Sequence, residues 1–233
     1  MSQPMIAPLA APQPQSTSDQ VFDALYRAVI SLQLPPGTKV SEADIAQQLN
    51  TSRQPVRDAF FRLSKLGFLA IRPQRATLIT KISEQAVLNA VFIRTAIELE
   101  CIRNLFAGDV AEHAAALRLI LNDQRTALAS PDKDRFHALD ETFHRVICER
   151  AGHPHAWDLI REQKAHMDRI RFLTLDATRR QSVVDEHACI IEAMESGDLP
   201  KIERKLRDHL SGIHKSLASV RTSHADFFEE EPT

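Results

Sequence analysis

The stretch NTSRQPVRDAFFRLSKLGFLAIRPQRA, Asn50 to Ala76, decides the fold of the front of this chain. Its apolar residues recur at helical spacing, which predicts a helix from about Arg53 to Lys65 that ends at Gly67. With Ser52 as the N-cap, Pro55 lies in the first turn, where a missing N–H removes no intrahelical hydrogen bond. The start of this helix is therefore expected to be rigid and well defined.

The two faces of this helix carry different side chains. Arg53 and Arg57 are four residues apart, so they share one face. The residues expected on the opposite, buried face are Val56, Ala59, Phe60, Leu63 and Leu66. A recognition helix contacts DNA through its N-terminal residues, and Ser52, Gln54 and the backbone N–H groups there are natural phosphate donors. Whether the arginines contact base edges or phosphates stays open, and an exposed pair that only aids solubility is the alternative.

The segments on either side complete a small domain. DQVFDALYRAVISLQL, from Asp19, predicts a helix stopped by PPGT, and SEADIAQQLN predicts a second helix capped by Ser41. Downstream, FLAIRP and RATLITKI carry β-favoured residues around RPQR, which predicts a two-stranded hairpin. Arg72 and Arg75 at its tip are candidates for contacts with the DNA backbone or the minor groove. Three short helices and a basic hairpin predict a winged helix-turn-helix domain over residues 19–81.

The composition bounds the class of protein. The chain has 233 residues, 43% of them hydrophobic and 26% charged, which suits one large or two modest globular domains. No apolar run approaches the roughly 18–20 residues of a membrane span, so no membrane is expected as a partner. Three distant cysteines without a CxxC motif indicate a reducing compartment, the cytoplasm. Residues 1–18, rich in Pro, Gln, Ser and Ala, are expected to be a disordered lead-in rather than a signal peptide.

Charge is distributed unevenly along the chain. Residues 1–80 contain eight Lys and Arg against five Asp and Glu, a balance of +3. The remaining 21 basic and 26 acidic residues give residues 81–233 a balance of −5. A mildly basic front on an acidic back indicates an anionic partner for the front part.

From residue 82 the pattern is helical throughout, so a mostly α protein is expected, with an all-α helical bundle over 82–220. Gly and Pro positions divide this region. The helices expected there are 84–106, 110–129, 132–151, 155–176, 181–196 and 199–219. Residues 221–233 are expected to form a flexible acidic tail.

Three histidines and an aspartate of this region predict a metal site. Asp140 and His144 are one turn apart on one helix, and His187 and His209 lie on apolar stripes of two others. Each feature alone fits a helix-edge hydrogen bond or a core histidine, but together they fit an interior site for a divalent ion. The mixed N/O ligands suit zinc first, with nickel or manganese as alternatives. His137 is a rival ligand placed further round its helix.

Arg94 and Glu98 lie on another helical stripe that is otherwise apolar. A guanidinium there must be paired or face a polar cavity. An Arg94–Glu98 ion pair within the helix is one interpretation, and contact with an anionic ligand is the other.

PPGTKVSEADIAQQLNTSRQPVRDAFFRLSKLGFLAIRPQRA, from Pro35 to Ala76, resembles the DNA-binding domain of GntR-superfamily regulators. The helical remainder resembles the FCD-type ligand-binding domain of the FadR-like branch. The resemblance implies operator contacts by Ser52, Arg53, Gln54, Arg57 and the wing residue Arg75. It also implies that a divalent ion is held by Asp140, His144, His187 and His209 at the base of an effector cavity, with Arg94 on the anionic group of the effector.

The function implied is a homodimeric transcriptional regulator, a repressor, that binds double-stranded operator DNA and a small carboxylate-type effector, and is not an enzyme. A metal-dependent hydrolase that uses the Asp and three His to activate water is the alternative. A purely structural metal in a regulator without an effector is a third interpretation. The effector and the operator cannot be identified from the residues.

Overall fold

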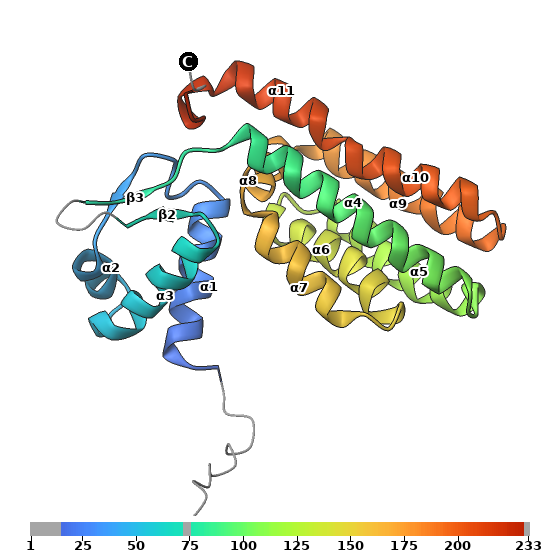
Figure 1. Ribbon diagram of the computed structural model, residues 1–233, viewed down its shortest axis with the longest axis horizontal. Helices are drawn as coiled ribbons and strands as arrows, with labels where there is room; N and C mark the ends of the chain where they lie inside the picture. The colour runs from blue at the N-terminus through green and yellow to red at the C-terminus, as the bar shows by residue number, and fades with distance from the viewer. Residues whose placement is uncertain (1–14, 72–75, 231–233) are drawn as a thin grey trace, which may run out of the picture.

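The computed structural model describes residues 15–71 and 76–230, which form a small front domain and a larger helical domain (Figure 1). The front domain contains α1 (Thr17–Ile30), α2 (Glu42–Gln48) and α3 (Arg53–Lys65). Its core is built on the predicted face of α3: Val56, Ala59, Phe60 and Leu63 are all buried. The predicted fold class, a winged helix-turn-helix followed by an all-helical domain, is confirmed.

The wing contains one strand more than predicted. β1 (Lys39–Val40), β2 (Leu69–Ala70) and β3 (Thr77–Ile79) form an antiparallel sheet in the order β1-β3-β2. β1 has only two residues, too few for an alternating pattern to reveal it, and it exists because it pairs with β3. Arg72 and Arg75, expected at the tip of the wing, lie outside the described residues, so their role stays a prediction.

The helical domain begins after the wing. Its helices are α4 (Glu84–Phe106), α5 (Val110–Ala127), α6 (Lys133–Arg150), α7 (Pro154–Gln163), α8 (Ala165–Thr174), α9 (Ala177–Glu195), α10 (Leu199–Ser211) and α11 (Ile213–Ser223). Two of the six predicted helices are therefore divided. The segment 155–176 breaks at Lys164, whose buried side chain pairs with acidic residues. The segment 199–219 breaks at Gly212, where a Cβ would lie 3.2 Å from the Arg179 guanidinium.

The expectation of a flexible tail from residue 221 is wrong for the residues described up to 230. α11 continues to Ser223, and a short 3-10 turn covers Ala225–Phe227. Phe228 is 2% exposed, and its neighbours bond to Ile82 on the linker before α4. The acidic composition of this segment predicts a solvated tail, but its two phenylalanines supply apolar area for burial.

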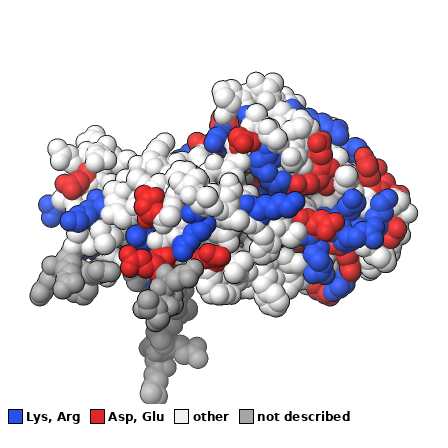
Figure 2. All heavy atoms as spheres, turned by 90° about the horizontal axis from the view of Figure 1, so that it is seen from above, with Lys and Arg blue, Asp and Glu red and all other residues white. Residues whose placement is uncertain are grey.

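The helix α8 joins the two domains. Ala165, at its start, belongs to the apolar core of the front domain, and Phe172 packs against the same core. On the face of the helical domain seen in Figure 2, acidic and basic side chains are interspersed. None of the helices within 15–71 and 76–230 combines the length and hydrophobicity needed to cross a bilayer.

Candidate functional site

The structure brings Asp140, His144, His187 and His209 together in the interior of the helical domain. Asp140 and His144 come from α6, His187 from α9 and His209 from α10. The Nε2 atom of His209 lies 3.1 Å from that of His144 and 3.3 Å from that of His187. Asp140 Oδ1 is 3.6 Å from His187 Nε2 and 4.0 Å from His144 Nε2. All four side chains are buried, so four possible ligand atoms face one point.

Each histidine is oriented by a second residue at its other nitrogen. Because these partners offer an oxygen acceptor, each Nδ1 carries the hydrogen and each Nε2 keeps its lone pair. Three lone pairs that meet this closely repel one another unless a cation lies among them. The acceptors are Glu98 for His144 at 2.6 Å, Gln124 for His187 at 2.9 Å and Glu186 for His209 at 2.6 Å.

The electrostatics of the site favour a metal ion. Burial lowers the pKa of His144 well below its ordinary value, and Arg94 adds to this shift. Burial does the same to the pKa of His187. Burial opposes ionisation of Asp140, but the charge of Arg171 helps to hold its pKa well below the usual range. Neutral imidazoles and an ionised carboxylate are the forms that bind metal.

Asp140 provides an independent test of this fit. Its Oδ2 pairs with Arg171, whereas its Oδ1 is buried and has no hydrogen-bond partner among the described residues. A buried carboxylate oxygen without a partner is costly, and this one faces the three imidazoles. The donor set and the vacant acceptor both fit a divalent ion.

Arg94 and Glu98 form an ion pair, but the two residues lie differently relative to this site. Arg94 Nε donates to Glu98 Oε1 at 2.6 Å, so the ion pair within α4 is present. The other oxygen of Glu98 accepts from His144, and Glu98 does not line the neighbouring cavity. The prediction that Glu98, with Arg94, contacts an effector stays a prediction; in the structure Glu98 orients the imidazole of His144.

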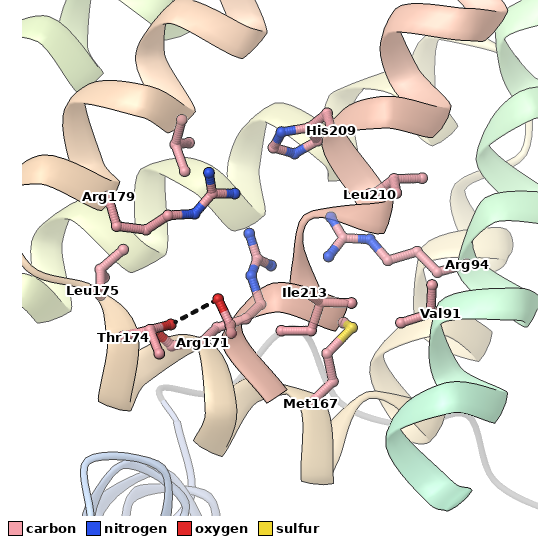
Figure 3. Close-up of a pocket in the computed structure, with 12 residues that line it drawn as sticks. Val91, Arg94, Met167, Arg171, Thr174, Leu175, Arg179, His209, Leu210 and Ile213 are labelled. Carbon is pink, nitrogen blue, oxygen red and sulfur yellow. Dashed lines mark hydrogen bonds between the residues drawn. The ribbon is translucent and has the colours of Figure 1, made fainter. Parts of the chain in front are cut away.

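A cavity lies beside the cluster, between α4, α8, α9, α10 and α11. Figure 3 shows Arg94, Arg171 and Arg179 directed into it, with His209 on its wall. Within residues 15–71 and 76–230, the buried Nη2 of Arg94 has no hydrogen-bond partner. Burial opposes its charge, but Glu98, Glu141 and Asp140 raise its pKa, so the guanidinium stays charged. The cavity holds about 30 Å³, room for one or two waters, so a larger ligand requires the arginines to move.

Sequence reasoning missed four residues of the site. Gln124 follows Leu117 and Leu121 on the buried stripe of α5, so a polar residue on an apolar stripe is the signal that could have revealed it. Glu186 immediately precedes His187. Arg171 and Arg179 carry no local signal, because only the tertiary fold directs them to one cavity. His137, the rival ligand, lies instead near Glu141 and Asp168.

The start of α3 presents a different kind of surface. Ser52 is the N-cap residue, but its side chain makes no capping hydrogen bond. Arg53 is exposed and has no ion-pair partner among residues 15–71 and 76–230. Arg57 pairs with Glu42 at 3.1 Å, and Gln54 donates to Asp58 at 3.0 Å. These exposed contacts are weak and can be exchanged for phosphate or base contacts.

Both halves of the chain match known protein families. The family of bacterial regulatory proteins, gntR family, matches residues 17–79, and the FCD domain matches residues 89–212. The HTH-type transcriptional repressor RspR of Escherichia coli K12 is 34% identical over 218 residues, 93% of this chain and 96% of that protein. A probable D-xylose utilization operon transcriptional repressor of Paenarthrobacter nicotinovorans is 30% identical, covering 87% of this chain and 89% of the relative.

Solved structures show the same fold. Escherichia coli McbR/YncC superposes with a TM-score of 0.72 at 18% identity, covering 91% of this chain and all of that one. A putative GntR regulator from Rhodococcus sp. RHA1 gives 0.71 at 21% identity, covering 88% and 99%. The matched families and relatives are transcriptional regulators, not enzymes. The chain belongs to the GntR family of transcriptional regulators and carries an FCD domain behind its helix-turn-helix domain.

Proposed function

We propose that this regulator is a homodimeric repressor controlled by a small organic acid, which binds beside a divalent metal ion in the helical domain. The observation that carries the proposal is the convergence of three oriented Nε2 atoms on the partnerless Oδ1 of Asp140, beside a cavity lined by three arginines. The imidazoles and the carboxylate supply metal ligands, and the guanidinium groups supply partners for an anion.

The metal would be held by Asp140, His144, His187 and His209, with zinc as the first candidate and nickel or manganese next. When bound, it supplies a Lewis-acidic position for a carboxylate oxygen. Arg94 would bind the same anionic group, because its Nη2 lacks a partner and lies on the cavity wall. Arg171 and Arg179 add positive charge on the other side of the cavity.

The front domain would bind operator DNA. The start of α3 would lie in the major groove, with contacts from Ser52, Arg53, Gln54 and Arg57, and the wing would add Arg72 and Arg75. A homodimer would present two such helices to a palindrome. Repression is the activity named for relatives at 34% and 30% identity, and a regulator of this kind works in the cytoplasm beside the chromosome.

Effector control requires that the acid bind one dimer geometry better than the other. A coupling of about 1–3 kcal/mol would change operator occupancy roughly 5–150-fold. Because the cavity is small and occupied by arginine side chains, binding of an acid must move them. The movement of charged side chains is the physical event from which such a change could start.

Operator binding tests this function. The dimer would be titrated onto its own upstream DNA with a panel of carboxylic acids, once with bound zinc and once after chelation. We expect at least one acid to change operator affinity in the zinc form and to lose its effect after chelation, and Arg94→Gln to blunt the response while zinc stays bound. An acid response that is equal after chelation would contradict the proposal. A zinc ion that raises the melting temperature while every acid stays inert would indicate a structural metal.

A further inference from the structure

A chain of buried ion pairs leaves the metal centre along α8. Arg171 on α8 pairs with Oδ2 of the ligand Asp140. Nη1 of the same guanidinium lies 3.5 Å from Oε1 of Glu141, the residue that follows Asp140 on α6. Arg171 also lines the cavity, so one side chain touches the metal ligand, its acidic neighbour and the proposed effector site.

The chain continues through Lys164, the residue at which α7 gives way to α8. Its side chain is 1% exposed, and its Nζ pairs with Oε2 of Glu141. The same Nζ lies 2.5 Å from Oδ2 of Asp168, one turn further along α8. A buried ammonium between two carboxylates cannot leave one without being held by the other, because an unpaired buried charge is strongly unfavourable.

The chain ends in the front domain. Tyr26 on α1 donates its hydroxyl hydrogen to Asp168 Oδ2 at 3.2 Å, a contact across 142 positions of sequence. The helix α1 packs closely against the recognition helix α3, as Figure 1 shows. The connection therefore runs from a metal ligand to the helix that supports the DNA-binding surface.

The same helix holds the linker between the domains. Arg169 donates to the carbonyl of Thr80 at 2.6 Å. His166 Nδ1 accepts from the backbone N–H of Ser83, the N-cap of α4, at 3.1 Å. These contacts attach one side of α8 to the linker between the domains, while Arg171 attaches it to the metal centre, so a shift of α8 affects both.

We propose that α8 couples the metal centre to the DNA-binding domain. Arg171 responds to the binding of a cation or an anion at the metal centre, and Tyr26 transmits that response to α1. The inference rests on the proposed function for its metal ion. A cation held by Asp140 would repel the Arg171 guanidinium, and an anion in the cavity would attract it, so both would move it into the cavity and away from Glu141. Glu141 then attracts Lys164 more strongly, so Lys164 neutralises less of the charge on Asp168. The Asp168 carboxylate then accepts the hydrogen bond from Tyr26 more strongly, which tightens the attachment of α1.

Hydrogen exchange tests the coupling without DNA or an acid. Zinc binding to the full chain would be measured first by calorimetry, followed by amide exchange of α1, residues 17–30, with and without zinc. In the natural sequence we expect zinc to slow exchange of α1 several-fold. Tyr26→Phe keeps the ring and removes only the hydroxyl, so it should bind zinc with unchanged affinity and lose most of the slowing.

Asp19→Asn is the matched control, because Asp19 pairs α1 with Arg62 on α3 and takes no part in the chain along α8. It should keep the zinc response. Equal slowing in Tyr26→Phe, or no effect of zinc on α1 in a chain that binds zinc, would overturn the coupling. Absence of zinc binding would overturn the metal centre and the coupling together. A failed operator test with an intact exchange response would overturn only the proposed function.

Discussion

The proposed metal centre and the start of α3 hold their side chains in opposite ways. In the metal centre every histidine is buried and fixed at Nδ1 by a second residue. At the start of α3, Arg53 is exposed without an ion-pair partner among the described residues, and Arg57 has only a surface pair with Glu42. A buried polar group must be satisfied by its neighbours, whereas an exposed one is satisfied by water. The interior site is therefore preorganised, and the surface site takes its geometry from the partner.

Removal of a metal ligand gives the largest expected effect. His209→Ala deletes one of three converging Nε2 atoms and opens the wall between the centre and the cavity. We expect zinc affinity to fall by more than the roughly 10–100-fold typical of outer residues, measured by competition with a chelator. His155→Ala, at a histidine whose side chain is 96% exposed, is the control and should bind zinc normally. Unchanged affinity in His209→Ala would show that these residues are not the site.

Substitution of a residue that orients a ligating histidine should give the next largest effect. Gln124→Leu removes the acceptor that orients His187, so the imidazole loses its fixed tautomer and direction. Zinc affinity is expected to fall about 10–100-fold, while Gln181→Leu, on the exposed side of α9, should have no effect. If the two variants bind zinc equally, the contrast between a preorganised interior and an adaptable surface fails.

The exposed arginines should affect DNA binding without affecting stability. Arg53→Ala is expected to weaken operator binding by about 1–3 kcal/mol if it contacts a base. A phosphate contact would instead weaken all sequences alike and reduce the salt dependence. The melting temperature should not change, because the side chain is exposed, and Arg145→Ala, on the surface of α6, is the control. Intact operator binding by both Arg53→Ala and Arg57→Ala would contradict the assignment of α3 as the DNA-contacting helix.

A smaller effect is expected from the pH dependence of His166 at the domain junction. Burial and Arg169 lower its pKa to about 3, whereas an unfolded histidine titrates near 6.5. The unfolded chain therefore binds more protons below about pH 6.5, and the free energy of unfolding falls as pH decreases towards 3. Thermal melts of the zinc-loaded protein between pH 6.5 and 5 should show a shallower decline in His166→Gln. An identical slope would mean that His166 is not held neutral by its surroundings.

Sequence reasoning reached the elements with a strong local signal. The apolar stripe of α3 and the cap at Ser41 are local features, and the structure contains both of them. The DxxxH spacing and the stripes with His187 and His209 predicted, for the same reason, the four side chains that the structure brings together. The missed features depend on distant partners: β1 exists through β3, the break at Lys164 through Glu141 and Asp168, and the cavity through arginines from three helices.

X-ray absorption at the zinc edge tests the central claim most directly. The full chain would be loaded with one equivalent of zinc, and the nearest ligand shell would be measured. The account predicts three imidazole nitrogens and at least one oxygen, at about 2.0–2.2 Å. A sulfur ligand at about 2.3 Å, from Cys148 one turn after His144, or a shell without imidazole would contradict the centre formed by Asp140, His144, His187 and His209.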